Sequence, residues 1–147
     1  MQHYSHPLGH TLTDTDIRAR FQSAHGWEAR YKELIKLAKQ LPPLDSVDKT
    51  EANAIHGCES QAWLVSALVK NEHEEGLWQF HCDSDARIVK GLMAVVLAAL
   101  NNKTAANIHG FDIDAYFAEL QLLAHLSPSR GNGLRAVVTA IKHSCTL

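Results

Sequence analysis

Cysteine, proline, aromatic side chains and net charge are all scarce in this sequence of 147 residues. It has three cysteines and four prolines, aromatic residues make up 7%, and 14 basic against 16 acidic residues leave a formal charge of −2. An odd number of scattered cysteines favours reduced thiols and argues against a disulfide framework. Nucleic-acid-binding domains usually carry a basic stripe and a high pI. A sequence pI near 6.5 therefore argues against nucleic acid as a ligand.

Long hydrophobic runs are missing as well. The longest strongly apolar run covers residues 88–100 and is interrupted by Lys90, so it is shorter than the span of about 20 residues that crosses a membrane. Residues 1–6 lack the basic region and apolar segment of a secretory signal. We therefore expect no membrane association and a cytoplasmic protein.

The composition is that of a globular protein, with 46% hydrophobic and 20% charged residues. A core of this size buries about 70% of the surface of the unfolded chain, which is enough for stability without disulfides or a structural metal. No internal repeat, low-complexity tract or linker divides the sequence. We expect residues 1–147 to form a single domain.

The pattern of apolar and capping residues predicts mostly helices. They are expected over residues 14–24, 27–41 and 86–101, in two short segments behind Thr104 and Asp112, and from Pro128 behind the cap Ser127. Asp83, Ser84 and Asp85 are expected to cap the helix over 86–101. That helix is apolar on more than one face, so it should be central and buried.

Short β-compatible runs occupy the middle of the sequence. Residues 61–69 and 77–82 flank a polar stretch and predict an antiparallel hairpin, and residues 54–56 could add a short strand. The prediction is an α+β fold in which a small three-stranded antiparallel sheet packs against helices.

Cys58 is the first candidate for chemistry. It follows Gly57 in a polar turn before a predicted strand, where a thiol can be exposed and the backbone can adopt unusual angles. His56 could help to lower the pKa of this thiol. The residues alone leave other functions open, because Cys58 is also compatible with a semi-buried side chain or with a hydrolase or peroxidase that uses His56 or His81 as its base.

Several separate blocks of the sequence resemble one known family. They are residues 27–31 (WEARY), 39–42 (KQLP), 55–63 (IHGCESQAW), 83–92 (DSDARIVKGL) and 126–134 (LSPSRGNGL). In this order they resemble the SufE family of sulfur acceptors, which partner cysteine desulfurases. Residues 6–11 (HPLGHT) and Glu59 are similar to the CsdE branch of that family.

The resemblance implies a fold shared with iron–sulfur scaffold proteins of the IscU type. It also implies that Cys58 receives sulfur as a persulfide from a pyridoxal-phosphate-dependent cysteine desulfurase and passes it to a downstream acceptor. The exchange depends on the thiolate fraction, nucleophilicity and access of Cys58. The pyridoxal phosphate belongs to the partner, so this chain is expected to bind no cofactor. An iron–sulfur scaffold remains a further alternative.

Four other residues are candidates for supporting the Cys58 loop or contacting the partner: Gly57, Glu59, Asp85 and Arg130. Arg130 could instead be structural and bond to carbonyls or to Asp85. Because an exposed persulfide is easily lost to free thiols or oxidised, we expect the loop to be partly sheltered until the partner docks. Ile55, Trp63 and Val65 could provide the apolar shelter.

The remaining cysteines and the ten histidines are weaker candidates. Cys82 could be a small buried side chain or a second thiol that resolves the persulfide on Cys58, and Cys145 is expected at a frayed end. His3, His6 and His10 could gather adventitious metal. However, no compact set of four ligands is visible, and we expect no metal site.

Overall fold

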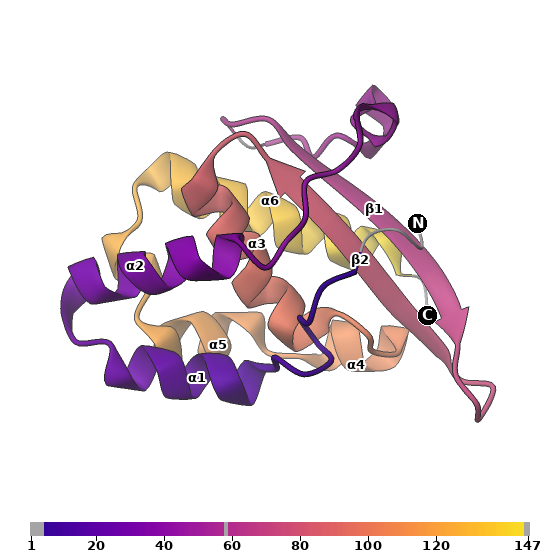
Figure 1. The fold of residues 1–147 in the computed structure, drawn as a ribbon, viewed down its shortest axis with the longest axis horizontal. Helices are drawn as coiled ribbons and strands as arrows, with labels where there is room; N and C mark the ends of the chain where they lie inside the picture. Colours follow the sequence, from indigo (N-terminus) through magenta and orange to yellow (C-terminus); the bar gives the residue numbers. More distant parts are fainter. Residues whose placement is uncertain (1–4, 58, 146–147) are drawn as a thin grey trace.

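The computed structural model describes residues 5–57 and 59–145 of the chain. Its helices are α1 (Asp14–Ser23), α2 (Gly26–Ala38), α3 (Arg87–Leu100), α4 (Ala105–Gly110), α5 (Ile113–Leu120) and α6 (Pro128–Ser144), with short 3₁₀ helices at Ser46–Asp48, Glu51–Asn53 and Leu123–His125. Strands β1 (Ala62–Lys70) and β2 (Gly76–Ser84) form a long hairpin along one side of the helices (Figure 1). The predicted α+β class is confirmed.

The sheet is smaller than predicted. In the described residues it contains two antiparallel strands, paired from Ala62 opposite Ser84 to Lys70 opposite Gly76. The expected third strand is reduced to one bridge between Ala54 and Trp63, next to a hydrogen bond from the Ile55 N–H to the Ala62 carbonyl. A 3₁₀ turn precedes this stretch and the chain turns at Gly57, so the extended segment is too short to form a strand.

Helix α3 is the centre of the core, as its apolar sequence predicted. Every residue from Gly91 to Leu100 is buried, and the helix contacts α2, α6, α1 and β2 (Figure 1). Gly91 permits the close approach of α2, because a Cβ there would lie 2.4 Å from the Leu34 carbonyl oxygen. The backbones of the two helices therefore touch at this point.

The helix caps were predicted well except at α3. Ser127, Thr104 and Asp112 each accept a hydrogen bond from the backbone N–H three residues later, as expected of N-caps. Helix α3 instead begins behind Ala86, and Ser84 Oγ accepts a hydrogen bond from the Ala86 N–H. The expectation that Asp83 caps this helix is wrong, since its carboxylate is buried and bonds elsewhere.

Hydrogen bonds join the segment before α1 to β2 and to the end of α3. The Asn101 side chain donates to the Leu8 carbonyl and accepts from the Phe80 N–H. His6 Nε2 lies 2.9 Å from the Phe80 carbonyl, and because a carbonyl only accepts, Nε2 must carry the proton. Burial lowers the pKa of His6, the bond to Phe80 opposes this effect, and the charge of His10 lowers the pKa further.

No helix in the described part of the chain is both long and apolar enough to cross a membrane.

Replacing Gly91 with alanine should destabilise the fold. The added methyl would push apart α2 and α3, and such overpacking costs about 1–3 kcal/mol in the free energy of unfolding, measured by urea titration. Gly110→Ala is the control, because a Cβ at that helical position meets nothing within 4 Å. Equal stability of Gly91→Ala and the wild type would show that the two helices can separate without cost.

The stability of the protein should fall as the pH is lowered below the ordinary histidine pKa of about 6.5. The folded pKa of His6 is depressed, so the unfolded chain binds more protons in acid. One such proton changes the free energy of unfolding by up to about 1.4 kcal/mol per pH unit. His6→Gln keeps a donor for Phe80 without titrating, and urea titrations between pH 7 and 5 should show a shallower loss. The exposed His143→Gln serves as control, and identical slopes for His6→Gln and the wild type would contradict the assignment.

Candidate functional site

Cys58, the predicted sulfur acceptor, lies outside the described residues, so the site is built from the chain on either side of it. Its neighbours Gly57 and Glu59 are both exposed, whereas Ile55 is buried. Two clefts, of about 380 and 310 Å³, meet at Glu59 and Ser60, which line both of them. The described residues on either side of Cys58 thus border two surface clefts.

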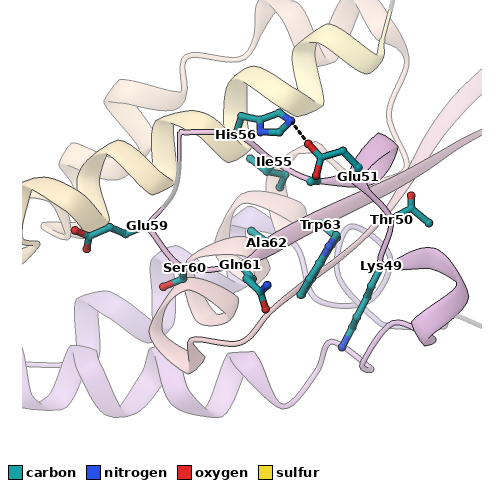
Figure 2. Close-up of a pocket in the computed structure, with 11 residues that line it drawn as sticks. Lys49, Thr50, Glu51, Ile55, His56, Glu59, Ser60, Gln61, Ala62 and Trp63 are labelled. Atoms are coloured by element: carbon teal, nitrogen blue, oxygen red, sulfur yellow. Dashed lines mark ion pairs between the residues drawn. The ribbon is translucent and has the colours of Figure 1, made fainter.

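The larger cleft lies between the two stems of this loop (Figure 2). We call residues 44–56 the incoming stem and residues 60–63 the outgoing stem. The cleft is lined by Lys49, Thr50, Glu51, Ala54, Ile55, His56, Glu59, Ser60, Gln61, Ala62 and Trp63. His56 Nε2 lies 3.4 Å from Glu51 Oε1, and both side chains are largely exposed. In Figure 2 the His56 ring points toward Glu51, while Glu59 points away on the other side of the loop.

The smaller cleft brings together residues that are far apart in the sequence. It is lined by Glu59, Ser60, Val89, Ser127, Ser129 and Arg130. The start of α6 therefore places Arg130 at the same cleft as Glu59 and Ser60. Within the described residues no ion pair joins Arg130 to Asp85, so the structure does not support the alternative in which Arg130 bonds to Asp85.

Asp85 meets the loop through its backbone. Its N–H donates to the Gln61 carbonyl over 3.2 Å, and Ser84 Oγ donates to the same carbonyl over 2.7 Å. The Asp85 side chain itself is exposed. The predicted supporting residue is therefore at the outgoing stem, with its carboxylate free to face solvent or a partner.

Asp83 is the site residue that sequence reasoning missed. Its carboxylate is 4% exposed and accepts hydrogen bonds from the N–H groups of Leu44 and Ser84. Lys90 Nζ lies 3.1 Å from Oδ1 and Lys49 Nζ lies 3.5 Å from Oδ2. Burial alone would raise the pKa of Asp83, but the Leu44 hydrogen bond and the Lys90 ammonium lower it below its ordinary value. Asp83 is therefore a buried, ionised anchor.

The other two cysteines are packed away from solvent. Cys82 is 1% exposed and burial raises the pKa of its thiol strongly, which supports the interpretation as a small core side chain over that of a resolving thiol. Cys145 was expected at a frayed end, but it is buried. Its Sγ lies 3.1 Å from the Ile141 carbonyl, and burial raises the pKa of this thiol to about 11.

Two of the three residues expected to shelter Cys58 line the larger cleft. Ile55 is buried and Trp63 is half-buried, and both line the larger cleft. Val65 is half-buried but does not line it. Across residues 5–57 and 59–145, no group of three histidine, cysteine or acidic side chains is placed to hold a metal ion. His3 lies outside the described residues.

Gly57 should be needed for the conformation of the loop. Its φ of +93° is strained for any residue with a Cβ, although a Cβ would have room beside Ala136. Gly57→Ala should cost about 1–2 kcal/mol in the free energy of unfolding and should change the alkylation rate of Cys58. Gly26→Ala is the matched control, since Gly26 has a φ of +83° with open space around it, far from the loop in sequence. An unchanged alkylation rate in Gly57→Ala would contradict a role in shaping the loop.

Comparison with known proteins agrees with this architecture. The model of the SufE family, described as an Fe-S metabolism associated domain, matches residues 15–145. The chain is 43% identical over 140 residues to the sulfur acceptor protein CsdE of Escherichia coli (strain K12), covering 95% of this chain and 92% of that protein. The solution structure of a hypothetical protein from Thermus thermophilus is similar in fold, with a TM-score of 0.66 and 17% identity over 88% of this chain and 90% of that one. The chain belongs to the SufE family, in the expected CsdE branch.

Proposed function

We propose that this protein is a sulfur relay that accepts sulfur from a cysteine desulfurase on Cys58 and passes it to a downstream acceptor. The observation that carries the proposal is the 43% identity to a named sulfur acceptor over nearly the whole chain. The site agrees with this function, because the loop containing Cys58 lies between two surface clefts that a partner could enter. In this role the protein also raises the turnover of the desulfurase by removing its bound sulfur.

The transfer is an exchange between sulfur atoms. The Cys58 thiolate attacks the outer sulfur of the persulfide on the desulfurase, forming a new S–S bond on Cys58. The S–S bond of the donor breaks, and its cysteine leaves as a thiolate. A thiolate of the downstream acceptor then attacks the outer sulfur on Cys58 in the same way. Neither step needs an external oxidant or reductant, and the pyridoxal phosphate chemistry remains in the partner.

The similarity to a named sulfur acceptor favours the relay over an autonomous thiol enzyme. Such an enzyme needs a base that is positioned for the nucleophile. Of the two candidate bases, His81 is buried on β2 beside the ring of His6, and His56 is exposed to solvent beside Glu51. An iron–sulfur scaffold would need further thiolate ligands. Cys82 and Cys145 are unsuited to this role, because burial raises the pKa of both thiols.

The desulfurase is proposed to dock over the loop and the smaller cleft. Glu59 and Arg130 line that cleft and are exposed, and the exposed Asp85 lies at the outgoing stem. Together they offer charges of both signs around the acceptor position. Such a rim provides orientation and specificity more than affinity.

Cys58→Ser should abolish sulfur acceptance and stimulation of the desulfurase, because a serine hydroxyl is a poor nucleophile toward sulfur at neutral pH. The protein would be incubated with a desulfurase and cysteine without reductant, and its intact mass compared with that of the wild type. The wild type and the control Cys82→Ala should gain the mass of sulfur, while Cys58→Ser should not. Full stimulation by Cys58→Ser would exclude Cys58 from the mechanism, and catalytic activity of the wild type alone would favour an autonomous enzyme.

A further inference from the structure

Residues 83–85 hold both stems of the loop that carries Cys58. On the incoming stem, the Leu44 N–H donates to Asp83 Oδ2 over 3.0 Å, and Lys49 Nζ lies 3.5 Å from the same oxygen. On the outgoing stem, Ser84 Oγ and the Asp85 N–H both donate to the Gln61 carbonyl. The end of β2 thereby fixes the two chain segments from which the loop projects.

Lys49 also joins the two stems directly. Its Nζ lies 5.1 Å from the centre of the Trp63 ring, so one ammonium on the incoming stem contacts an aromatic side chain on the outgoing stem. Figure 2 shows the two side chains next to each other on the wall of the larger cleft. Trp63 is also the residue paired with Asp83 in the β1–β2 register. Lys49, Trp63 and Asp83 thus form one connected group, which we call the clip.

The charges in the clip allow the role of Lys49 in the loop to be tested without destabilising the core. Asp83 is a buried anion between two ammonium groups, and Lys90 is the closer of the two. The Lys90 side chain is 16% exposed, whereas that of Lys49 is 34% exposed. Removing Lys49 therefore leaves Asp83 paired and hydrogen-bonded, so no unpaired charge remains buried. Lys49 therefore affects the loop more than the stability of the core.

We propose that Lys49 is a positioning residue for the acceptor loop, which rests on the proposed function of Cys58. While the clip is formed, Lys49 holds the incoming stem against Trp63 of the outgoing stem and restricts the conformations of the loop between them. When Lys49 is lost, the bond from Leu44 to Asp83 and the bonds to the Gln61 carbonyl remain, but the segment between these two anchors moves more freely and reagents reach Cys58 more often. A cation–π contact and a partly exposed ion pair are each weak. The clip can thus bias the loop without locking it, as a relay needs if partner docking is to expose the thiol.

The test uses Lys49→Met in the full chain, with Cys58 alkylation followed by peptide mass spectrometry in the absence of a partner. Losing the contact with Trp63 should raise the rate of Cys58 alkylation about threefold. Hydrogen exchange of the amides in residues 50–57 should accelerate under the same conditions. Lys49→Arg should restore both rates, because a guanidinium binds a carboxylate and stacks on an indole ring.

Lys90→Met is the matched control. It removes the other ammonium from the same carboxylate, but Lys90 lines neither cleft, so the alkylation rate of Cys58 should not change in the native protein. Wild-type rates in Lys49→Met, or equal acceleration in Lys90→Met, would overturn the clip. Sulfur acceptance by Cys58→Ser would instead overturn the proposed function, and the accessibility measured for Lys49→Met would still stand as a separate result.

Discussion

Helix α3 is apolar on nearly every side, and the fold depends on covering it. All ten residues from Gly91 to Leu100 are buried, and α2, β2, α6 and α1 pack around them. A two-stranded hairpin is marginal on its own in water, so β1 and β2 owe their stability to this helix. The position of the candidate site follows from this constraint, because the loop enters β1 at Ala62, which pairs with Ser84 at the end of β2, just before α3.

The turn from β2 into α3 serves the core and the site at once. Asp83 is nearly inaccessible to solvent, yet its carboxylate binds the incoming stem through Leu44 and Lys49. The next two residues bind the outgoing stem through one carbonyl. A buried, hydrogen-bonded charge is costly to move, because any displacement leaves an unpaired ion in a poorly solvated place. The base of the loop is therefore fixed at Leu44 and Gln61 by the rigid part of the molecule, and freedom of movement is left to the residues between these two anchors.

Features set by neighbouring residues could be predicted from the sequence, and features set by distant contacts could not. Ser127 caps α6 through a bond three residues away, and the apolar faces of α3 show directly in its sequence. By contrast, the role of Asp83 depends on Leu44, which is 39 residues away, and the pattern of an acid followed by serine is also typical of a helix cap. The burial of Cys145 was missed for a similar reason, since packing overrides the usual fraying of a chain end. The expected third strand failed because a turn on each side shortens it to a single bridge.

The burial of Cys82 and Cys145 shows how the fold can favour the proposed transfer of sulfur to Cys58. A persulfide relay is harmed by a second reactive thiol nearby, because that thiol could attack the inner sulfur and release the cargo as a disulfide forms. Thiol attack requires the thiolate, and burial opposes ionisation of both Cys82 and Cys145. Cys82 lies within β2 with its side chain in the core, and Cys145 is closed off behind the end of α6. The same packing that stabilises the domain therefore removes the internal competitors of the proposed acceptor, so discrimination between the thiols needs no dedicated machinery.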